Sequence, residues 1–202
     1  GAGGAGAART DRRPGRRSGT PEASHPPTPA SAVALRRPER LGLGVRGRAV
    51  RGMAGGEMTA LHASCVALPP EGGRPARALL ILGPSGAGKS SLALRLMGLG
   101  ARLVADDRTE LCRRGAALVA SAPGAIRGLI EARGLGLIRA PALAEAVVAL
   151  AVDLGRRETR RLPAERRGDW LGVEVPVLHA VETSCFPEAL MLCLRHDRGA
   201  TA

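Results

Sequence analysis

Lys89 is the only lysine in a chain of 202 residues that also carries 29 arginines. It stands in "GPSGAGKS", residues 83–90, which matches the pattern G-x-x-x-x-G-K-[ST]. In such a segment the glycines let backbone N–H groups turn toward phosphate oxygens, and the following helix directs the positive end of its dipole to the same point. A compact ammonium fits this cavity, whereas the wide planar fork of arginine does not. A phosphate-binding role therefore accounts for the single lysine.

Every residue of this segment is a candidate for binding a nucleotide. We expect the phosphates to be held by Gly83, Pro84, Ser85, Gly86, Ala87, Gly88, Lys89 and Ser90. The Ser90 hydroxyl is suited to Mg²⁺. The apolar run at 78–82 predicts a buried parallel strand before the loop. Leu92, Leu96 and Leu99 fall on one side of a predicted helix, which should end at "GLG".

Two adjacent carboxylates follow the next apolar run. Residues 103–105 in "ARLVADDR" predict a second buried strand, and Asp106 and Asp107 stand at its carboxyl end, where open α/β sheets bind ligands. Beside Mg²⁺ and phosphates, one carboxylate can support the metal while the other takes a proton from an incoming hydroxyl. An acidic turn that merely closes the strand is the alternative.

A third segment, "IEARGLGLI" at residues 130–138, places Glu131 and Arg133 just before Gly134 and Gly136. The two glycines indicate a tight backbone path next to a ligand. Such a segment is more often a loop that leads into a strand, and by itself it does not distinguish this from a ligand-binding segment.

Together "GPSGAGKS", "RLVADDR" and "EARGLGLI" resemble the catalytic domain of HPr kinase/phosphorylase, which acts on a serine of the phosphocarrier protein HPr. The resemblance covers residues 58–196. Because nothing here resembles the extra N-terminal domain of longer members, the chain looks like the short form of alphaproteobacteria. It implies an α/β fold, a P-loop kinase core of the HPr kinase/PEP carboxykinase-like type, with a mixed sheet and flanking helices. We expect that sheet to end in the strands "WLGVEVPVL" and "ALMLCL".

The resemblance also implies roles for individual residues. The glycine loop would bind ATP or pyrophosphate, Ser90 and Glu131 would ligate Mg²⁺, and Lys89 would neutralise phosphate charge. Asp107 would be the base in phosphorylation and the acid in the reverse reaction, and Asp106 would support the metal site.

His62 and Arg161 complete the implied site. The family has a histidine upstream of the loop, and His62 in "LHASCVAL" is the candidate, although a histidine before a strand is more often a core or surface residue. The stretch "PPEGGRPAR" between His62 and the loop predicts a hairpin turn. Arg161 in "ETRRLP" would stabilise charge on the transferred group. Its neighbours Arg160, Arg157 and Arg156 are alternatives, since a basic run is usually a solvated face.

The implied function is transfer of phosphate from Mg·ATP to a seryl residue of HPr, with inorganic phosphate running the reverse step to give pyrophosphate. The family assembles as hexamers, so a homo-oligomer is expected. A small-molecule P-loop kinase and a nucleotide-sensing module without turnover remain alternatives. The C-terminal segment that the family uses for dephosphorylation is not recognisable in "HAVETSCFPEALMLCL".

Composition sets the remaining expectations. The net charge is +12, and residues 1–57 hold 11 arginines and four acids among many Gly, Pro and Ala residues. We expect this segment to be a disordered tail upstream of a natural start at Met58, rather than a transit peptide or a nucleic-acid-binding arm. Residues 197–202 should fray. Without a C-x-x-C pair or an apolar run of about 18 residues, the sequence predicts a cytoplasmic protein with reduced cysteines, without zinc and without a membrane segment.

Overall fold

The structure, a computed structural model, describes residues 39–40, 48–51 and 57–196. The expectations for residues 1–38, 41–47, 52–56 and 197–202 lie outside these described residues. The first half of the described chain contains β1 (Glu39–Arg40), β2 (Arg48–Arg51), β3 (Glu57–Leu61), β4 (Ser64–Leu68), β5 (Arg77–Leu82), α1 (Lys89–Gly98), β6 (Arg102–Ala105), β7 (Thr109–Arg114) and β8 (Ala117–Ser121). The second half contains a 3₁₀ turn (Gly124–Ile126), β9 (Leu129–Ala132), β10 (Gly136–Arg139), β11 (Glu145–Arg157), β12 (Arg166–Trp170), β13 (Val173–Ala180) and α2 (Phe186–His196).

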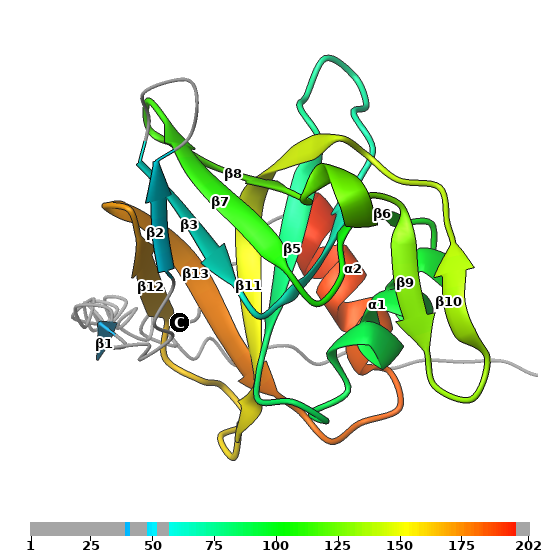
Figure 1. Ribbon diagram of the computed structural model, residues 1–202. Coiled ribbons are helices and arrows are strands. Elements are labelled where there is room, and N and C mark those ends of the chain that lie inside the picture. Colours follow the sequence, from blue (N-terminus) through cyan, green and yellow to red (C-terminus); the bar gives the residue numbers. More distant parts are fainter. Residues whose placement is uncertain (1–38, 41–47, 52–56, 197–202) are drawn as a thin grey trace, which may run out of the picture. The chain divides into compact units, whose positions relative to one another are not determined.

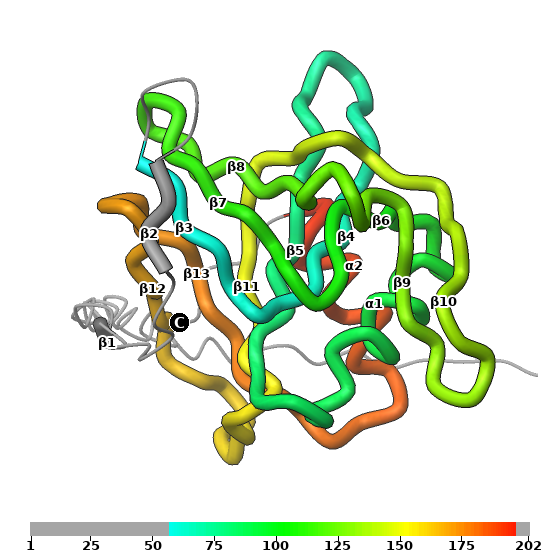
Figure 2. The backbone as a smooth tube through the Cα atoms, in the orientation of Figure 1, coloured from blue at the N-terminus to red at the C-terminus, as the bar shows by residue number. Residues whose placement is uncertain are grey.

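The long strand β11 organises a mixed sheet (Figure 1). It runs parallel to β5 along one edge, while on its other edge its first residues pair antiparallel with β8 and its last residues pair parallel with β13. Beyond β5 lie β4 and then β6, each antiparallel to its neighbour (Figure 2). The strands β5 and β6 therefore point the same way and end at the same edge of the sheet.

Both faces of β5 are buried, which explains its continuous apolar sequence. Leu80 and Leu82 pack into one hydrophobic cluster with residues of β3, β7 and β8. Leu79 and Ile81, on the opposite face, pack against α1 and α2. The prediction of a buried strand at 78–82, parallel to a neighbour, is confirmed in its pairing with β11.

Helix α1 covers the sheet through Leu92 and Leu96, as the apolar spacing predicts. Leu99 was expected on the same side, but it is 37% exposed because the helix ends at Gly98. Gly100 then takes a left-handed conformation with φ 100°, and its N–H donates to the Met97 carbonyl. The predicted glycine stop of the helix is thus confirmed.

The C-terminal segment differs from its prediction. "WLGVEVPVL" does form the end of β12 and most of β13, but "ALMLCL" lies within α2 and is not a strand. Leu190, Met191 and Leu194 are buried at helical spacing, whereas Leu192 is 58% exposed. A run of six apolar residues fits both the helical and the strand periodicity. The segment is a helix here, and it packs against β5 and α1. Within the described residues, no helix combines the length and hydropathy that crossing a membrane requires.

The segment 158–165 connects β11 to β12 and is closed by a buried ion pair. Arg166 Nη1 lies 2.5 Å from Glu158 Oε2, and the two side chains are only 11% and 7% exposed. The other carboxylate oxygen of Glu158 accepts the N–H groups of Thr159 and Arg160. Burial alone raises the pKa of Glu158, but the hydrogen bonds from Arg160, Arg166 and Thr159 outweigh it and hold that pKa below its ordinary value.

We expect Arg166→Ala to lower the free energy of unfolding at neutral pH by about 3 kcal/mol, because Glu158 would remain buried without its partner. Since the native pKa of Glu158 is lowered, its stabilising contribution is present above the ordinary glutamate pKa and is lost as the pH falls through the native value. Urea unfolding at neutral and at acidic pH would measure this. A difference between wild type and variant that stays constant into acid would contradict the assignment.

Candidate active site

A polar cavity of about 290 Å³ lies at the edge where β5 and β6 end. Its wall is formed by His62, Ser85, Gly86, Gly88, Lys89, Ser90, Ser91, Asp107, Glu131 and Arg133. The residues after β5 and those after β6 meet here because both strands run antiparallel to β4. The sequence expectation that the glycine segment and the two aspartates lie at one sheet edge is met by this geometry.

The glycine loop is held tightly between β5 and α1. Gly83 has φ 144°, and a Cβ on it would lie 3.1 Å from the Ala87 Cβ and 3.2 Å from the Leu154 Cβ. Gly88, with φ 90°, is the last residue before α1 begins at Lys89. Side chains at either position would strain the backbone. The loop therefore brings the first residues of α1, with their free N–H groups, to the cavity wall.

Lys89 is folded back into the loop and is only 7% exposed. Its Nζ donates to the carbonyl oxygens of Gly83 and Pro84, each at 3.0 Å, and lies 3.0 Å from His62 Nε2. Burial lowers the pKa of Lys89, while the charges of Asp107 and Asp106 act in the opposite direction. A lysine with a lowered native pKa favours folding more as the pH rises toward the ordinary lysine range.

His62 bridges Lys89 and Asp107. An ammonium group only donates hydrogen bonds, so Nε2 of a neutral His62 accepts from Lys89 and the ring proton lies on Nδ1. Nδ1 is 3.0 Å from Asp107 Oδ1 and 3.1 Å from the Asp107 carbonyl oxygen. The structure thus brings three of the predicted site residues into one hydrogen-bonded line.

Asp106 holds the floor of the site together. It is 6% exposed, and its Oδ1 accepts the Ser64 hydroxyl at 2.6 Å. The Ser90 hydroxyl lies 2.9 Å and 3.1 Å from its two oxygens, and the Glu131 N–H donates to Oδ2 at 3.1 Å. One carboxylate therefore joins β4, α1, β6 and β9.

Ser64 is a residue that the sequence analysis missed. It is fully buried in an otherwise apolar strand, two residues after His62. A buried hydroxyl needs a partner, so a serine inside a buried strand close to a candidate site residue was the available signal. The acceptor could not be named without the fold, because Asp106 is 42 residues away in sequence.

Asp107 differs sharply from its neighbour. Its backbone has φ 64°, a left-handed conformation that aspartate tolerates better than most residues. Its side chain is 79% exposed, and its Oδ1 lies 3.0 Å from His62 Nδ1. The two carboxylates of the pair thus occupy different environments, one locked in the interior and one open at the mouth of the cavity.

The hairpin of β9 and β10 supplies Glu131 and Arg133. These two strands form a separate two-stranded sheet that contacts α1 (Figure 2). Gly134 and Gly136 have φ 83° and 92°, so the predicted tight backbone path is the turn of this hairpin. Glu131 and Arg133 are both exposed and line the cavity.

The donor set fits a hard cation. Within the described parts of the chain, no group of three or more His, Cys, Asp or Glu side chains is arranged to hold a metal ion by itself. The Ser90 hydroxyl and the Glu131 carboxylate supply oxygen ligands at the cavity. Mg²⁺ commonly keeps most of its waters and takes one or two protein oxygens together with substrate phosphates, so these residues suit it.

Arg161 is not among the residues that line the cavity. It lies exposed in the segment 158–165. Of its neighbours, Arg156 lies 3.5 Å from an oxygen of Asp153, and Arg157 pairs with Glu182. The arginine at the cavity wall is Arg133, from the hairpin.

Comparison with known proteins places this geometry in a class. The structure of the HPr(Ser) kinase/phosphatase from Coxiella burnetii aligns with a TM-score of 0.55 at 23% identity, over 67% of this chain and 93% of that chain. The chain thus shares the fold of that structure, a mixed sheet with few helices.

Sequence comparison finds similarity to the same group of proteins over part of the chain. The model of the "HPr Serine kinase C-terminal domain" matches residues 57–149. The HPr kinase/phosphorylase of Exiguobacterium sp. is 48% identical over 82 residues, which cover 40% of this chain and 24% of that protein. That of Bacillus licheniformis is 39% identical over 111 residues, 52% of this chain and 35% of that protein. Residues 57–149 are thus similar in sequence to the C-terminal domain of HPr kinase/phosphorylases, and the chain spans about a quarter to a third of the length of these relatives.

The two aspartates should respond differently to the same substitution. The Asp106 carboxylate accepts all four of its hydrogen-bond contacts, whereas an asparagine amide would present one donor group to them. Asp106→Asn should therefore lower the free energy of unfolding by about 2 kcal/mol. Asp107→Asn alters an exposed side chain, and asparagine also tolerates a positive φ, so a change within about 0.5 kcal/mol is expected. Urea denaturation of both variants measures this. Equal losses would show that Asp106 does not tie the site together.

Proposed function

We propose that the described domain is a Mg²⁺-dependent protein-serine kinase that transfers phosphate from ATP to HPr. The observation that carries the proposal is the line of contacts from Asp107 through His62 to Lys89 at the mouth of the cavity. It links an exposed carboxylate, suited to take a proton from a hydroxyl, through His62 to a buried ammonium, suited to neutralise phosphate charge. The similarity of residues 57–149 to the HPr serine kinase C-terminal domain supports HPr as the acceptor.

In the proposed mechanism, residues 83–90 act as a P-loop. Backbone N–H groups of the loop and of the first turn of α1 cradle the phosphates, and the Lys89 ammonium neutralises their charge. Asp106 accepts a hydrogen bond from the Ser90 hydroxyl, so a lone pair of the Ser90 oxygen remains for a cation. Ser90 and Glu131 would hold Mg²⁺, which would supply positive charge beside the phosphates.

Asp107 is the proposed base. It would take the proton of the acceptor seryl hydroxyl as that oxygen approaches the terminal phosphorus in line. The Nδ1–H of His62, 3.0 Å from Asp107 Oδ1, would orient the Asp107 carboxylate. In the reverse direction an oxygen of inorganic phosphate would attack the phosphorus of phosphoserine and form pyrophosphate. The bond from phosphorus to the serine oxygen would break, and protonated Asp107 would give its proton to that oxygen.

An arginine is proposed to complete the site from outside the cavity wall. The segment 158–165 follows β11, which runs parallel to β5, so it leaves the sheet at the same end as the glycine loop (Figure 1). Arg161, exposed on this segment, would reach the transferred group when substrates bind. Arg133 is a second candidate, because it already lines the cavity.

The wider assignment follows the family. We infer a short form of alphaproteobacterial type, with a catalytic domain over residues 58–196, a cytoplasmic location and a hexameric assembly. Residues 1–57 would be dispensable for activity. A small-molecule kinase or a nucleotide sensor would share the same phosphate loop, so the acceptor and the need for Asp107 are the points to test.

The test is transfer of labelled phosphate from Mg·ATP to purified HPr. Asp107→Asn should lower the rate about 10²- to 10⁴-fold, as expected for loss of a general base, with ATP affinity little changed. Asp169→Asn is the matched control, because Asp169 lies exposed in β12, does not line the cavity and accepts the N–H of Gly172. ATP binding without transfer to HPr would favour a sensor. Phosphate transfer to a small molecule alone would favour the second kinase class.

A further inference from the structure

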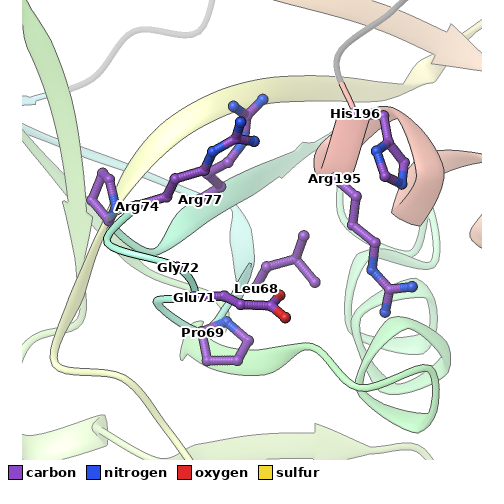
Figure 3. A pocket seen from close by; sticks show the side chains of 9 residues that line it. Leu68, Pro69, Glu71, Gly72, Arg74, Arg77, Arg195 and His196 are labelled. Atoms are coloured by element: carbon purple, nitrogen blue, oxygen red, sulfur yellow. The ribbon is translucent and has the colours of Figure 1, made fainter.

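The two ends of β5 have different surroundings. At its first residue a cavity of about 310 Å³ lies between the hairpin that joins β4 to β5 and the last turn of α2 (Figure 3). Gly72 and Gly73 have φ 57° and 77°, and the Arg74 N–H donates to the Glu71 carbonyl at 2.9 Å. The hairpin turn expected in "PPEGGRPAR" is thus confirmed. Arg74 and Arg195 lie on opposite sides of this hollow, so they do not meet at one ligand group (Figure 3).

At the last residue of β5, the neighbouring strand β11 forms a bulge beside the glycine loop. The pairing of β11 with β5 ends at Asp153, opposite that last residue. On its other edge β11 advances from Asp153 to Arg157 while β13 advances only from His179 to Ala180. Residues 154–156 therefore have no register partner on β13, and we call them the β11 bulge. Such bulges redirect a strand and are common next to active sites.

The β11 bulge lies against the first residues of the glycine loop. A Cβ on Gly155 would lie 3.0 Å from Pro84 Cδ and 4.0 Å from the Gly83 Cα, and a Cβ on Gly83 would lie 3.3 Å from the Gly155 nitrogen. Gly155 is not among the glycines with positive φ, so it is the lack of space that requires glycine here. Neither Leu154 nor Gly155 lines the cavity of the candidate active site. The bulge therefore supports the loop from outside that site.

The two loop residues that the bulge contacts also hold Lys89. The carbonyl oxygens of Gly83 and Pro84 accept the hydrogen bonds from Lys89 Nζ. A shift of Gly83 and Pro84 would move the ammonium group or break these hydrogen bonds. The position of the bulge thus bears on where the positive charge stands at the cavity wall.

Asp153 closes the bulge. Its side chain is only 11% exposed, and its Oδ1 accepts the Gly155 N–H at 2.9 Å. Its Oδ2 lies 3.5 Å from Arg156 Nε. A buried carboxylate is costly unless its oxygens are paired, and both of these partners belong to the bulge. Asp153 does not line the cavity, so its contacts act on the shape of the strand.

We propose that Asp153 and Gly155 are positioning residues for phosphate binding. The inference rests on the proposed function, since it takes residues 83–90 to be the phosphate-binding loop. The Asp153 carboxylate holds the bulge in shape, and the Gly155 backbone supports Gly83 and Pro84. The loop then presents its N–H groups and Lys89 in the geometry that the phosphates of ATP need. Binding groups that are misplaced by about 1 Å can cost about 10²-fold in rate.

Gly155→Ala is the direct test. The added methyl group would meet the rigid ring of Pro84 at 3.0 Å, so the loop has to shift. The dissociation constant of Mg·ATP, and its KM in phosphate transfer to HPr, should each rise about tenfold, while the KM for HPr stays unchanged. Gly124→Ala is the matched control, because a Cβ on Gly124 would meet no atom within 4 Å and its φ is not positive. Thermal unfolding shows whether each variant is folded.

Variants of Asp153 supply a second arm that does not depend on the folding of Gly155→Ala. Asp153→Ala removes the acceptor of the Gly155 N–H and should weaken Mg·ATP binding about fivefold, as expected for one lost hydrogen bond. Asp153→Asn keeps an oxygen acceptor at the same place and should retain most of the wild-type affinity. Recovery by asparagine would assign the effect to the hydrogen bond that closes the bulge.

The outcomes separate this inference from the proposed function. A wild-type chain that does not bind Mg·ATP would refute the phosphate loop itself, and the positioning role with it. Wild-type binding together with unchanged ATP affinity in folded Gly155→Ala, or in Asp153→Ala, would overturn the positioning role alone. An equal rise of the KM values for ATP and for HPr in Gly155→Ala would indicate a general loss of structure and would also overturn it.

Discussion

The candidate active site depends on the buried carboxylate of Asp106. Its oxygens accept hydrogen bonds from Ser64 on β4, Ser90 on α1 and the Glu131 backbone on β9. Each of these elements carries or adjoins a residue at the cavity wall. A charged group in the interior is tolerated only when it is well hydrogen-bonded, so the same contacts that satisfy Asp106 fix the spacing between the glycine loop and the β9–β10 hairpin.

The sheet explains why the remaining residues meet. A single strand, β4, separates β5 from β6 and reverses direction relative to both, so two segments distant in sequence end side by side. His62 lies two residues before β4 and therefore stands at the same edge, beside Asp107. Three neighbouring strands thus bring Asp107, His62 and the glycine loop together.

The sequence could predict those parts of the fold that depend on local chemistry. The loop, the strand before it and the glycine stop of α1 follow from residue types within about 20 positions, and the Asp106–Asp107 pair follows from its place after an apolar run. The different burial of the two aspartates did not follow, because it depends on contacts with Ser64 and Ser90 from other elements. The helix at 186–196 was mistaken for a strand because a run of six apolar residues fits both periods until its partner surface is known.

The choice between Arg161 and Arg133 could not be made from the sequence either. A basic run contains several side chains of equal chemistry, and only the fold shows which of them pair with Asp153 or Glu182. Domain boundaries before Met58 depend on residues that are largely outside the described structure, so they stay predictions.

The internal contacts of Lys89 have a consequence for ligand affinity. Its three donors already meet two carbonyl oxygens and a ring nitrogen. A phosphate that takes one of them displaces an existing acceptor, so association exchanges hydrogen bonds rather than adding them. Such an exchange contributes little enthalpy, so the share of the attraction that comes from Lys89 must rest on opposite charge. That share would weaken as the salt concentration rises, since added ions screen the charge of Lys89.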